Sequence, residues 1–161
     1  MEVHMEKLKI VYKSVDDLIP YINNPRINDH AVDAVASSIK NFGFKVPIII
    51  DSENEIVAGH TRLKAAKKLG MKEVPTIVAD DLDDNQIKAF RLADNKVGEL
   101  AAWDFSALEI ELQNIGDIDM NSFEFGDEDF MIFTLNDAED ELNNFEDIAS
   151  KKTCPHCGGI L

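Results

Sequence analysis

Residues 57–70 read VAGHTRLKAAKKLG, a short apolar run followed at once by residues that favour a helix. A helix N-terminus presents unpaired backbone N–H groups and a partial positive charge. Gly59 lets the backbone approach a ligand closely because it has no Cβ. Thr61 can donate a hydroxyl, and the planar fork of Arg62 can bond two phosphate oxygens. The stretch therefore predicts an anion site where this helix begins.

The same residues also fit a helix start without a ligand. In that interpretation Gly59 is a turn residue, Thr61 caps the helix and Arg62 lies on the surface. His60 fits a hydrogen-bonded turn histidine better than a catalytic base, because nothing nearby in the sequence fixes its tautomer or its pKa. The residues alone leave both interpretations open.

Strands and helices alternate on both sides of this stretch. Period-2 patterns, helical spacing and turn residues predict the elements in turn. They are a strand at 7–15, a helix at 29–44, a hairpin at 45–59 with its turn at 51–54, the helix at 59–69, a strand at 73–80, and helices at 83–100 and 103–115. The sequence thus predicts an α/β (α+β) fold, a small mixed sheet flanked by helices with a helical acidic extension.

Capping signals refine two of these elements. For the helix at 29–44, Asn28 or Asp29 is available as the N-cap and Gly43 as the stop. Residues 14–17 have the spacing of a capping box over a short turn.

Charge is distributed unevenly along the 161 residues. The net charge is −15, of which residues 1–102 contribute −2 and residues 103–161 contribute −13, and no lysine or arginine occurs from Val97 to Ser150. Such a segment repels nucleic acid, because it cannot neutralise phosphates. DNA contact, if any, is therefore expected through residues 1–100.

The sequence shows neither an apolar run of the ~18 residues that a membrane helix needs nor a signal peptide. We therefore expect a cytoplasmic protein with no membrane partner. The two cysteines, Cys154 and Cys157, cannot provide a disulfide framework for the fold.

Three motifs together resemble the ParB N-terminal domain, which has the ParB/sulfiredoxin-like fold. They are NNPRIN at 23–28, VAGHTRLKAAKKLG at 57–70 and RLADNKVGEL at 91–100, and the resemblance runs from about Lys7 to Leu100. It implies a nucleoside triphosphate, CTP or ATP, held with Mg²⁺. His60 and Thr61 stand where partitioning proteins carry a glutamate and an arginine. The turn lacks a cysteine, which rules out sulfiredoxin chemistry.

The resemblance assigns nucleotide-binding roles to residues in each motif. The implied set is Asn24, Pro25, Arg26, Gly59, His60, Thr61, Arg62 and Asn95. Asp94 could be a ligand of Mg²⁺, which accepts hard oxygen ligands. Alternatively, Asp94 pairs with Arg91 or Lys88 on its own helix.

The C-terminal part divides further by composition. Residues 101–135 form the predicted helical acidic extension, 136–151 an acidic linker, and 152–161 a tail resembling part of a zinc knuckle. Cys154 and Cys157 have the C-x-x-C spacing of half a tetrahedral Zn²⁺ site. The other half could come from a longer chain or a second chain, or the cysteines could be free.

The first functional hypothesis is a ParB-like nucleotide-binding module that acts with phage or mobile-element DNA-modification or partition machinery, such as a DNA methyltransferase. NTP hydrolysis is left open. A second hypothesis is a small-metabolite kinase resembling free-serine kinases, in which Asp29, Asp33 or His60 is the base. A third is a non-enzymatic acidic interaction protein or DNA mimic.

Overall fold

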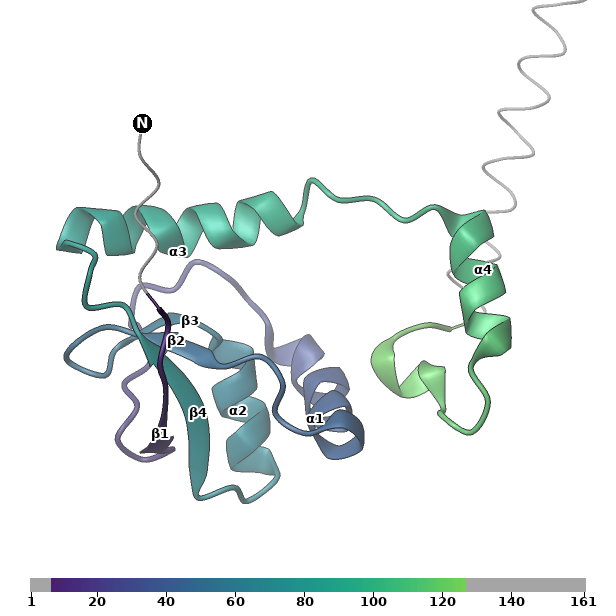
Figure 1. The fold of residues 1–161 in the computed structure, drawn as a ribbon, viewed down its shortest axis with the longest axis horizontal. Coiled ribbons are helices and arrows are strands. Elements are labelled where there is room, and N and C mark those ends of the chain that lie inside the picture. Colours follow the sequence, from purple (N-terminus) through teal and green to yellow (C-terminus); the bar gives the residue numbers. More distant parts are fainter. Residues whose placement is uncertain (1–6, 127–161) are drawn as a thin grey trace, which may run out of the picture. The chain divides into compact units, whose positions relative to one another are not determined.

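The computed structural model describes residues 7–126, in which four strands form one mixed sheet (Figure 1). The elements are β1 (Ile10–Ser14), η1 (Asp29–Ala31), α1 (Val32–Phe42), β2 (Ile48–Ile50), β3 (Ile56–Ala58), α2 (His60–Lys68), β4 (Glu73–Val78), α3 (Asp84–Gly98), α4 (Phe105–Asn114) and η2 (Met120–Phe123). The strand order is β1-β4-β2-β3, in which β2 and β4 run parallel and the other pairs antiparallel. The predicted fold class is confirmed.

The core lies between the sheet and α2. Ile48, Ile50 and Ile56 are fully buried, and Leu63 and Ala66 of α2 pack against them. Each such large side chain contributes about 1.5–3 kcal/mol by leaving water. In Figure 1, α1 and α2 lie side by side below β2 and β3, and α3 lies above them. Burial of β3 thus fixes the place where α2 begins.

The predicted hairpin is present, and a carboxylate closes its turn. The Asp51 Oδ1 atom accepts the backbone N–H groups of Glu53 at 2.9 Å and Glu55 at 2.8 Å. Asn54 takes the left-handed conformation with φ 66°, which asparagine tolerates better than most residues. The turn directs β3 back along β2 toward Gly59.

Strand β1 forms one edge of the sheet. It pairs with β4 from Ile10 opposite Ile77 to Ser14 opposite Glu73. The buried Thr76 hydroxyl donates to the Val11 carbonyl at 2.7 Å and holds this edge in place. The lysines of this stretch are Lys7, Lys9 and Lys13, and they alternate with the exposed side chains of Leu8, Ile10 and Tyr12.

Helix α1 ends as predicted but begins differently. Gly43 has φ 78°, and its N–H donates to Ile39 O at 2.9 Å, so the predicted stop is confirmed. Asn28 is the N-cap residue of the 3₁₀ turn η1, but the N-cap residue of α1 is Ala31, and neither Asn28 nor Asp29 caps a helix through its side chain. The Asp29 carboxylate instead pairs with Lys64 of α2, and a 3₁₀ turn precedes α1.

Capping also differs from expectation at two other places. The Ser14 Oγ atom accepts the Asp16 N–H at 3.2 Å instead of the Asp17 N–H that a capping box needs, and residues 15–17 form a turn. A complete capping box occurs at α3, where Asp83 Oδ1 accepts the Gln86 N–H and Gln86 Oε1 accepts the Asp83 N–H, both at 2.9 Å. The sequence had shown only that acids open this helix.

Residues after α3 contribute little to the buried core. The helix predicted at 103–115 is present as α4, but none of its residues is buried. In η2, the Phe123 ring stacks on Phe42 of α1 with centroids 5.4 Å apart.

The chain divides into two compact units at Phe123 and Glu124. The predicted linker and zinc tail lie outside the described residues, and no described helix is long and apolar enough to cross a membrane.

Candidate functional site

The three predicted motif segments surround one cavity of about 770 Å³. Its lining comes from the loop at 21–31, from residues 57–62 at the start of α2, and from residues 88–99 of α3 and its C-cap. The lining includes every predicted site residue in the described range, namely Asn24, Pro25, Arg26, Gly59, His60, Thr61, Arg62, Asp94 and Asn95. Residues separated by up to 71 positions in the sequence thus share one site.

Residues 57–62 form what we call the inner wall of the cavity. Gly59 is the N-cap of α2 with φ 110°, and a Cβ there would lie 3.3 Å from Ile48 Cγ1 and 3.4 Å from Arg62 Cζ. The first helical hydrogen bond runs from Leu63 N–H to Gly59 O at 3.1 Å. The N–H groups of residues 60–62 therefore have no partner within α2. No side chain caps this helix, so Thr61 does not have the capping role that the ligand-free interpretation gave it.

Arg62 is held on one side by backbone carbonyls. Its Nη1 atom donates to Val46 O at 2.8 Å and to Pro47 O at 2.5 Å. Burial lowers the pKa of Arg62, and the nearby negative charge of Asp94 raises it in part. An arginine stays protonated in proteins, so Arg62 places a half-buried fixed cation in the cavity.

His60 accepts a hydrogen bond from a distant backbone group. The Tyr21 N–H donates to His60 Nε2 at 3.2 Å. Burial lowers the pKa of His60, as do the charges of Arg91 and Lys64, while Glu55 raises it. His60 is thus the first residue of α2, and its Nε2 atom accepts a hydrogen bond from the loop.

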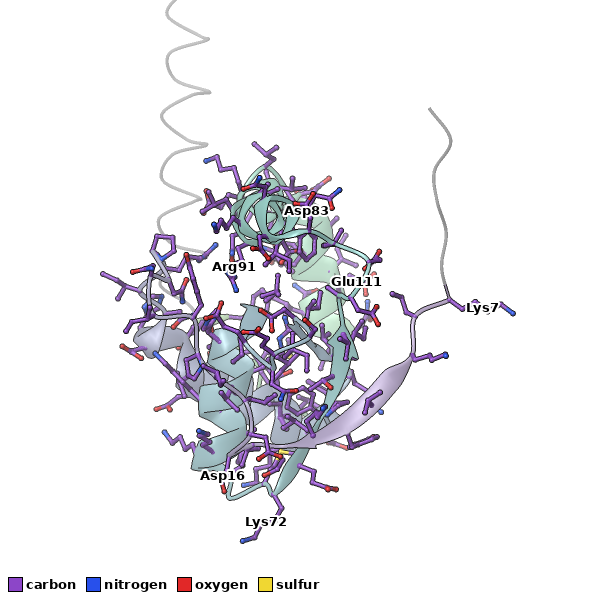
Figure 2. The ribbon with its side chains drawn as sticks, turned by 90° about the vertical axis from the view of Figure 1, so that its left-hand side faces the viewer. Lys7, Asp16, Lys72, Asp83, Arg91 and Glu111 are labelled. Atoms are coloured by element: carbon purple, nitrogen blue, oxygen red, sulfur yellow. The ribbon has the colours of Figure 1, made fainter. Side chains whose placement is uncertain are left out.

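Arg91 of α3 is buried and joins several segments at once. Its Nη2 atom lies 2.5 Å from Glu55 Oε1, its Nε atom donates to Ile56 O at 3.3 Å, and its guanidinium lies 3.8 Å from the Tyr21 ring centroid. Figure 2 shows Arg91 on the side of α3 that faces the rest of the fold. The suggested pairing of Asp94 with Arg91 is wrong, because Glu55 takes that place.

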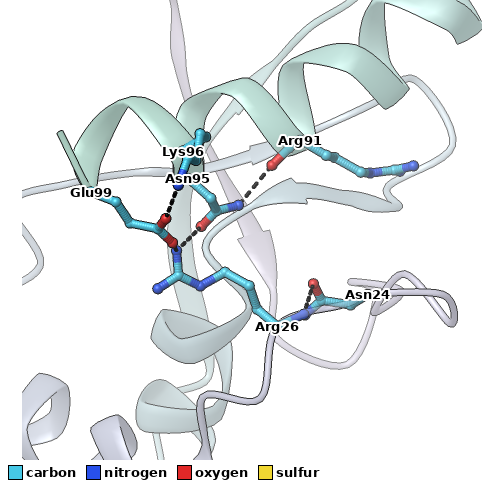
Figure 3. Close-up of polar contacts among 6 residues, drawn as sticks. All are labelled: Asn24, Arg26, Arg91, Asn95, Lys96 and Glu99. Atoms are coloured by element: carbon cyan, nitrogen blue, oxygen red, sulfur yellow. Dashed lines mark hydrogen bonds and ion pairs between the residues drawn. The ribbon is translucent and has the colours of Figure 1, made fainter.

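Arg26 connects the loop to the end of α3 (Figure 3). Its Nη1 atom lies 3.2 Å from Asn95 Oδ1 and 3.5 Å from Glu99 Oε1. The Asn95 amide is oriented by its own bond to Arg91 O at 2.7 Å, and Asn24 Oδ1 accepts the Arg26 N–H at 3.3 Å. The first and third motifs are therefore in direct contact.

The sequence patterns did not identify Tyr21, Glu55 or Glu99 as parts of this arrangement. A signal for the buried arginine was present, because Arg91 lies four residues after Ile87 on the buried face of α3. A cation at an apolar position of a helix requires a charged or carbonyl partner. Its partner Glu55 lies 36 positions away, which no local pattern shows.

Charge in the cavity contrasts with charge in the whole chain. The lining carries four cationic side chains, Arg26, Arg62, Lys88 and Arg91, and two carboxylates, Asp94 and Glu99. The chain as a whole has a net charge of −15. A local excess of cations in a concave site concentrates anions there.

Within residues 7–126, no group of three or more histidine, cysteine, aspartate or glutamate residues is placed to hold a metal ion. Asp94 is an exposed carboxylate of the cavity lining. Cys154 and Cys157 lie outside the described residues. Asp29 and Asp33, named as bases for a kinase, form ion pairs with Lys64 and Lys68 of α2.

Sequence comparisons match the first part of the chain to one family and to known proteins. The ParB N-terminal domain family matches residues 1–96. A ParB-like nuclease domain-containing protein, YnaK, of Escherichia coli K12 is 48% identical over 84 residues, covering 50% of this chain and 94% of YnaK. A probable chromosome-partitioning protein ParB of Campylobacter jejuni is 35% identical over 99 residues, covering 58% of this chain and 35% of that protein.

The fold also matches a solved structure. The C-terminally truncated chromosome-partitioning protein ParB of Caulobacter crescentus, complexed with CTP-γ-S, superposes with a TM-score of 0.54 and 23% identity. The match covers 76% of this chain and 68% of that one. The matched part is thus nearly all of YnaK but about a third of the C. jejuni protein. By its sequence match and its fold, this chain belongs to the ParB N-terminal domain family.

Proposed function

We propose that this chain binds a nucleoside triphosphate, CTP or ATP, in the cavity between the loop at 21–31, the start of α2 and α3. One observation carries the proposal: three separated segments bring four cationic side chains and a helix N-terminus to one cavity in a strongly acidic chain. A polyphosphate is the anion whose several charges this number of cations suits.

The inner wall supplies the phosphate contacts. The N–H groups of residues 60–62 have no partner within α2, and the partial positive charge of the helix lies at the same place. Gly59 leaves the approach to them open, and Arg62 adds a cation held by Val46 and Pro47. Arg26 faces the same cavity from the loop.

Mg²⁺ fits this site as a companion of the nucleotide. Mg²⁺ in nucleotide sites is bound by one or two carboxylates, by phosphate oxygens and by water. Asp94 lines the cavity close enough to Arg62 to affect its pKa, so its carboxylate would hold the ion beside phosphates bound at Arg62. The ion would neutralise charge between Asp94 and the phosphates. The Asn95 Oδ1 atom already accepts from Arg26, which favours a positioning role for Asn95.

The relatives support CTP as the first ligand to test, since the C. crescentus partitioning protein was solved with CTP-γ-S. We further propose that the chain acts with DNA-modifying or partition proteins of phages or mobile elements. The names of two relatives, a chromosome-partitioning protein and a nuclease domain-containing protein, support an association with DNA-processing proteins. The link to phages or mobile elements rests on the sequence resemblance. Hydrolysis and DNA cleavage are therefore the activities to measure once binding is established.

Calorimetric titration of the purified chain with CTP and then ATP, with Mg²⁺, tests the proposal. We expect saturable binding that Arg62→Ala and Arg26→Gln each weaken by at least about tenfold, since charge-assisted bonds to phosphate are lost. The matched control is Lys67→Ala, because Lys67 is an exposed cation of α2 outside the cavity lining. No binding by the parent chain, or equal affinity in all variants, would refute the proposal.

Arg26→Gln keeps the test independent of folding. Arg62 contacts the backbone before β2, so its loss can also weaken the fold. The Arg26 side chain is about half exposed and contacts only exposed or half-exposed groups of α3 and its C-cap. Thermal unfolding of each variant separates loss of the ligand site from loss of structure.

A further inference from the structure

His60 joins the inner wall of the cavity to the loop that carries Arg26. Its Nε2 atom accepts the N–H of Tyr21, 39 positions earlier in the chain. The loop from Tyr21 to Ala31 contains no buried residue, so little apolar packing fixes its backbone. This hydrogen bond therefore holds the start of the loop against α2.

The bond exists in only one protonation state of the histidine. A neutral imidazole has one nitrogen with a lone pair, whereas an imidazolium donates from both nitrogens. Acceptance at Nε2 requires the proton to be on Nδ1. Protonation of His60 would therefore set two donors against each other and release Tyr21.

The surroundings favour the neutral state. The charged groups that face His60 are Arg91 from α3, Lys64 from α2 and Glu55 from the turn before β3. Burial, Arg91 and Lys64 lower the pKa of His60 below its ordinary value, and Glu55 opposes them. The Arg91 guanidinium also lies 3.8 Å from the Tyr21 ring centroid, so both contacts of Tyr21 act on the same loop.

We propose that His60 is a positioning residue of the nucleotide site, which as a neutral acceptor fixes the loop bearing Arg26 and does not itself bind phosphate. This inference rests on the proposed nucleotide binding. It assigns His60 a role different from the phosphate contact that the family resemblance implies.

The two roles predict opposite responses to acid. A histidine that binds phosphate directly does so better when it is protonated, so acid would strengthen binding. A positioning histidine loses its acceptor when it is protonated, so acid weakens binding. Since burial and the charges of Arg91 and Lys64 lower the pKa of His60 below its ordinary value, this effect is weaker at neutral pH than it would be for an exposed histidine. It grows as the pH falls through the lowered pKa.

The affinity for CTP with Mg²⁺ is measured at pH 7.5 and pH 5.5 for the parent, His60→Gln, His60→Phe and His30→Gln. The glutamine oxygen can accept the Tyr21 N–H and does not titrate, so His60→Gln should bind at pH 7.5 within about threefold of the parent. His60→Phe has no acceptor and should bind weakly at both pH values. His30 lines the same cavity, so His30→Gln controls for a change of charge alone.

The expected result is that the parent loses more affinity than His60→Gln as the pH falls from 7.5 to 5.5, because the competent fraction falls. Protonation of the phosphates of the ligand affects both proteins equally and cancels in this comparison. Parallel losses in the two proteins, or tighter binding of the parent at pH 5.5, would overturn the role assigned to His60 while leaving nucleotide binding intact. No binding by the parent at pH 7.5 would instead overturn the proposed function and this inference with it.

Nuclear magnetic resonance tests the same inference without a ligand. The ¹⁵N shifts of His60 should show the Nδ1–H tautomer at pH 7.5, and the Tyr21 amide should shift with the titration of His60. An Nε2–H tautomer would contradict the proposal whatever the binding data show.

Discussion

The cavity has walls of two kinds. The inner wall, residues 57–62, continues directly from buried strand β3, and Val57 and Ala58 are themselves buried. The outer walls, the loop at 21–31 and residues 88–99, contain one buried residue, Arg91. The position of the inner wall is thus fixed by the packing of the buried core, whereas a few polar contacts hold the outer walls.

Because the two kinds of wall are held differently, changes in them should affect stability and nucleotide binding differently. Changes in the inner wall should lower the free energy of unfolding together with affinity, because its position and the core are linked. Changes at the exposed ends of the outer walls should alter affinity at nearly constant stability. Arg91 should show both effects, since it lines the cavity and is, with Ile87, one of the two buried residues of α3.

The largest effect is expected for Gly59→Val. A β-branched residue at φ 110° is strained, and its Cβ would lie 3.3 Å from Ile48 Cγ1. We expect a loss of about 3 kcal/mol in the free energy of unfolding, measured by urea denaturation, with loss of nucleotide binding.

Gly70→Val is the matched control for Gly59→Val. Gly70 also has a positive φ, 70°, but a Cβ there meets nothing within 4 Å. Gly70→Val should lower the free energy of unfolding only through backbone strain, by about 1–2 kcal/mol. Equal losses at the two glycines would show that contact with Ile48 does not constrain the inner wall.

A smaller loss of stability is expected for Arg91→Met. The change removes the ion pair with Glu55 and the contact with the Tyr21 ring, at a cost of about 2 kcal/mol. Adding Glu55→Gln should recover part of this loss, because the unpaired carboxylate is then gone. Additive losses in this double-mutant cycle would contradict direct coupling of the two side chains.

Asn95→Ala should affect affinity more than stability. Arg26 would lose its acceptor at 3.2 Å, and we expect nucleotide binding to weaken about three- to tenfold with a stability change below about 1 kcal/mol. The ratio of affinities should be the same with Mg²⁺ and with EDTA. An effect present only with Mg²⁺ would show instead that Asn95 binds the metal.

The smallest effect, and one of opposite sign, is expected for Glu99→Gln. The Glu99 carboxylate lies 3.5 Å from Arg26 Nη1 and competes there with an anionic ligand. Its removal should tighten binding about twofold at low salt, and less at high salt. Glu53→Gln, an exposed change in the hairpin turn outside the cavity lining, should leave affinity unchanged.

Local patterns in the sequence predicted most of the sheet-and-helix fold. The apolar runs around residues 51–54 and the turn cluster between them specify a hairpin, and the helix after Gly59 follows from propensity. These features depend on neighbours in the chain. Local patterns also indicated the anion site at Gly59, Thr61 and Arg62, whereas the loop residues and Asn95 were named only through the resemblance to the ParB N-terminal domain.

The contacts that shape the site were not predictable in this way. His60 with Tyr21 and Arg91 with Glu55 are pairs separated by 39 and 36 positions. Periodicity shows that a side chain is buried, but it does not show which group from another segment pairs with that side chain. The missing side-chain cap before α1 was not predictable for the same reason, because the Asp29 carboxylate pairs with Lys64 of another helix.

The edge strand has a consequence for how copies of this chain meet at high concentration. Lys13 lies in β1 and Lys7 and Lys9 lie just before it, so a second copy aligned along this edge would bring two groups of lysines close together. Like charges so placed oppose the strand pairing that an open, partly apolar edge would otherwise promote. Repulsion between these lysines therefore disfavours edge-to-edge aggregation, and salt weakens this repulsion by screening.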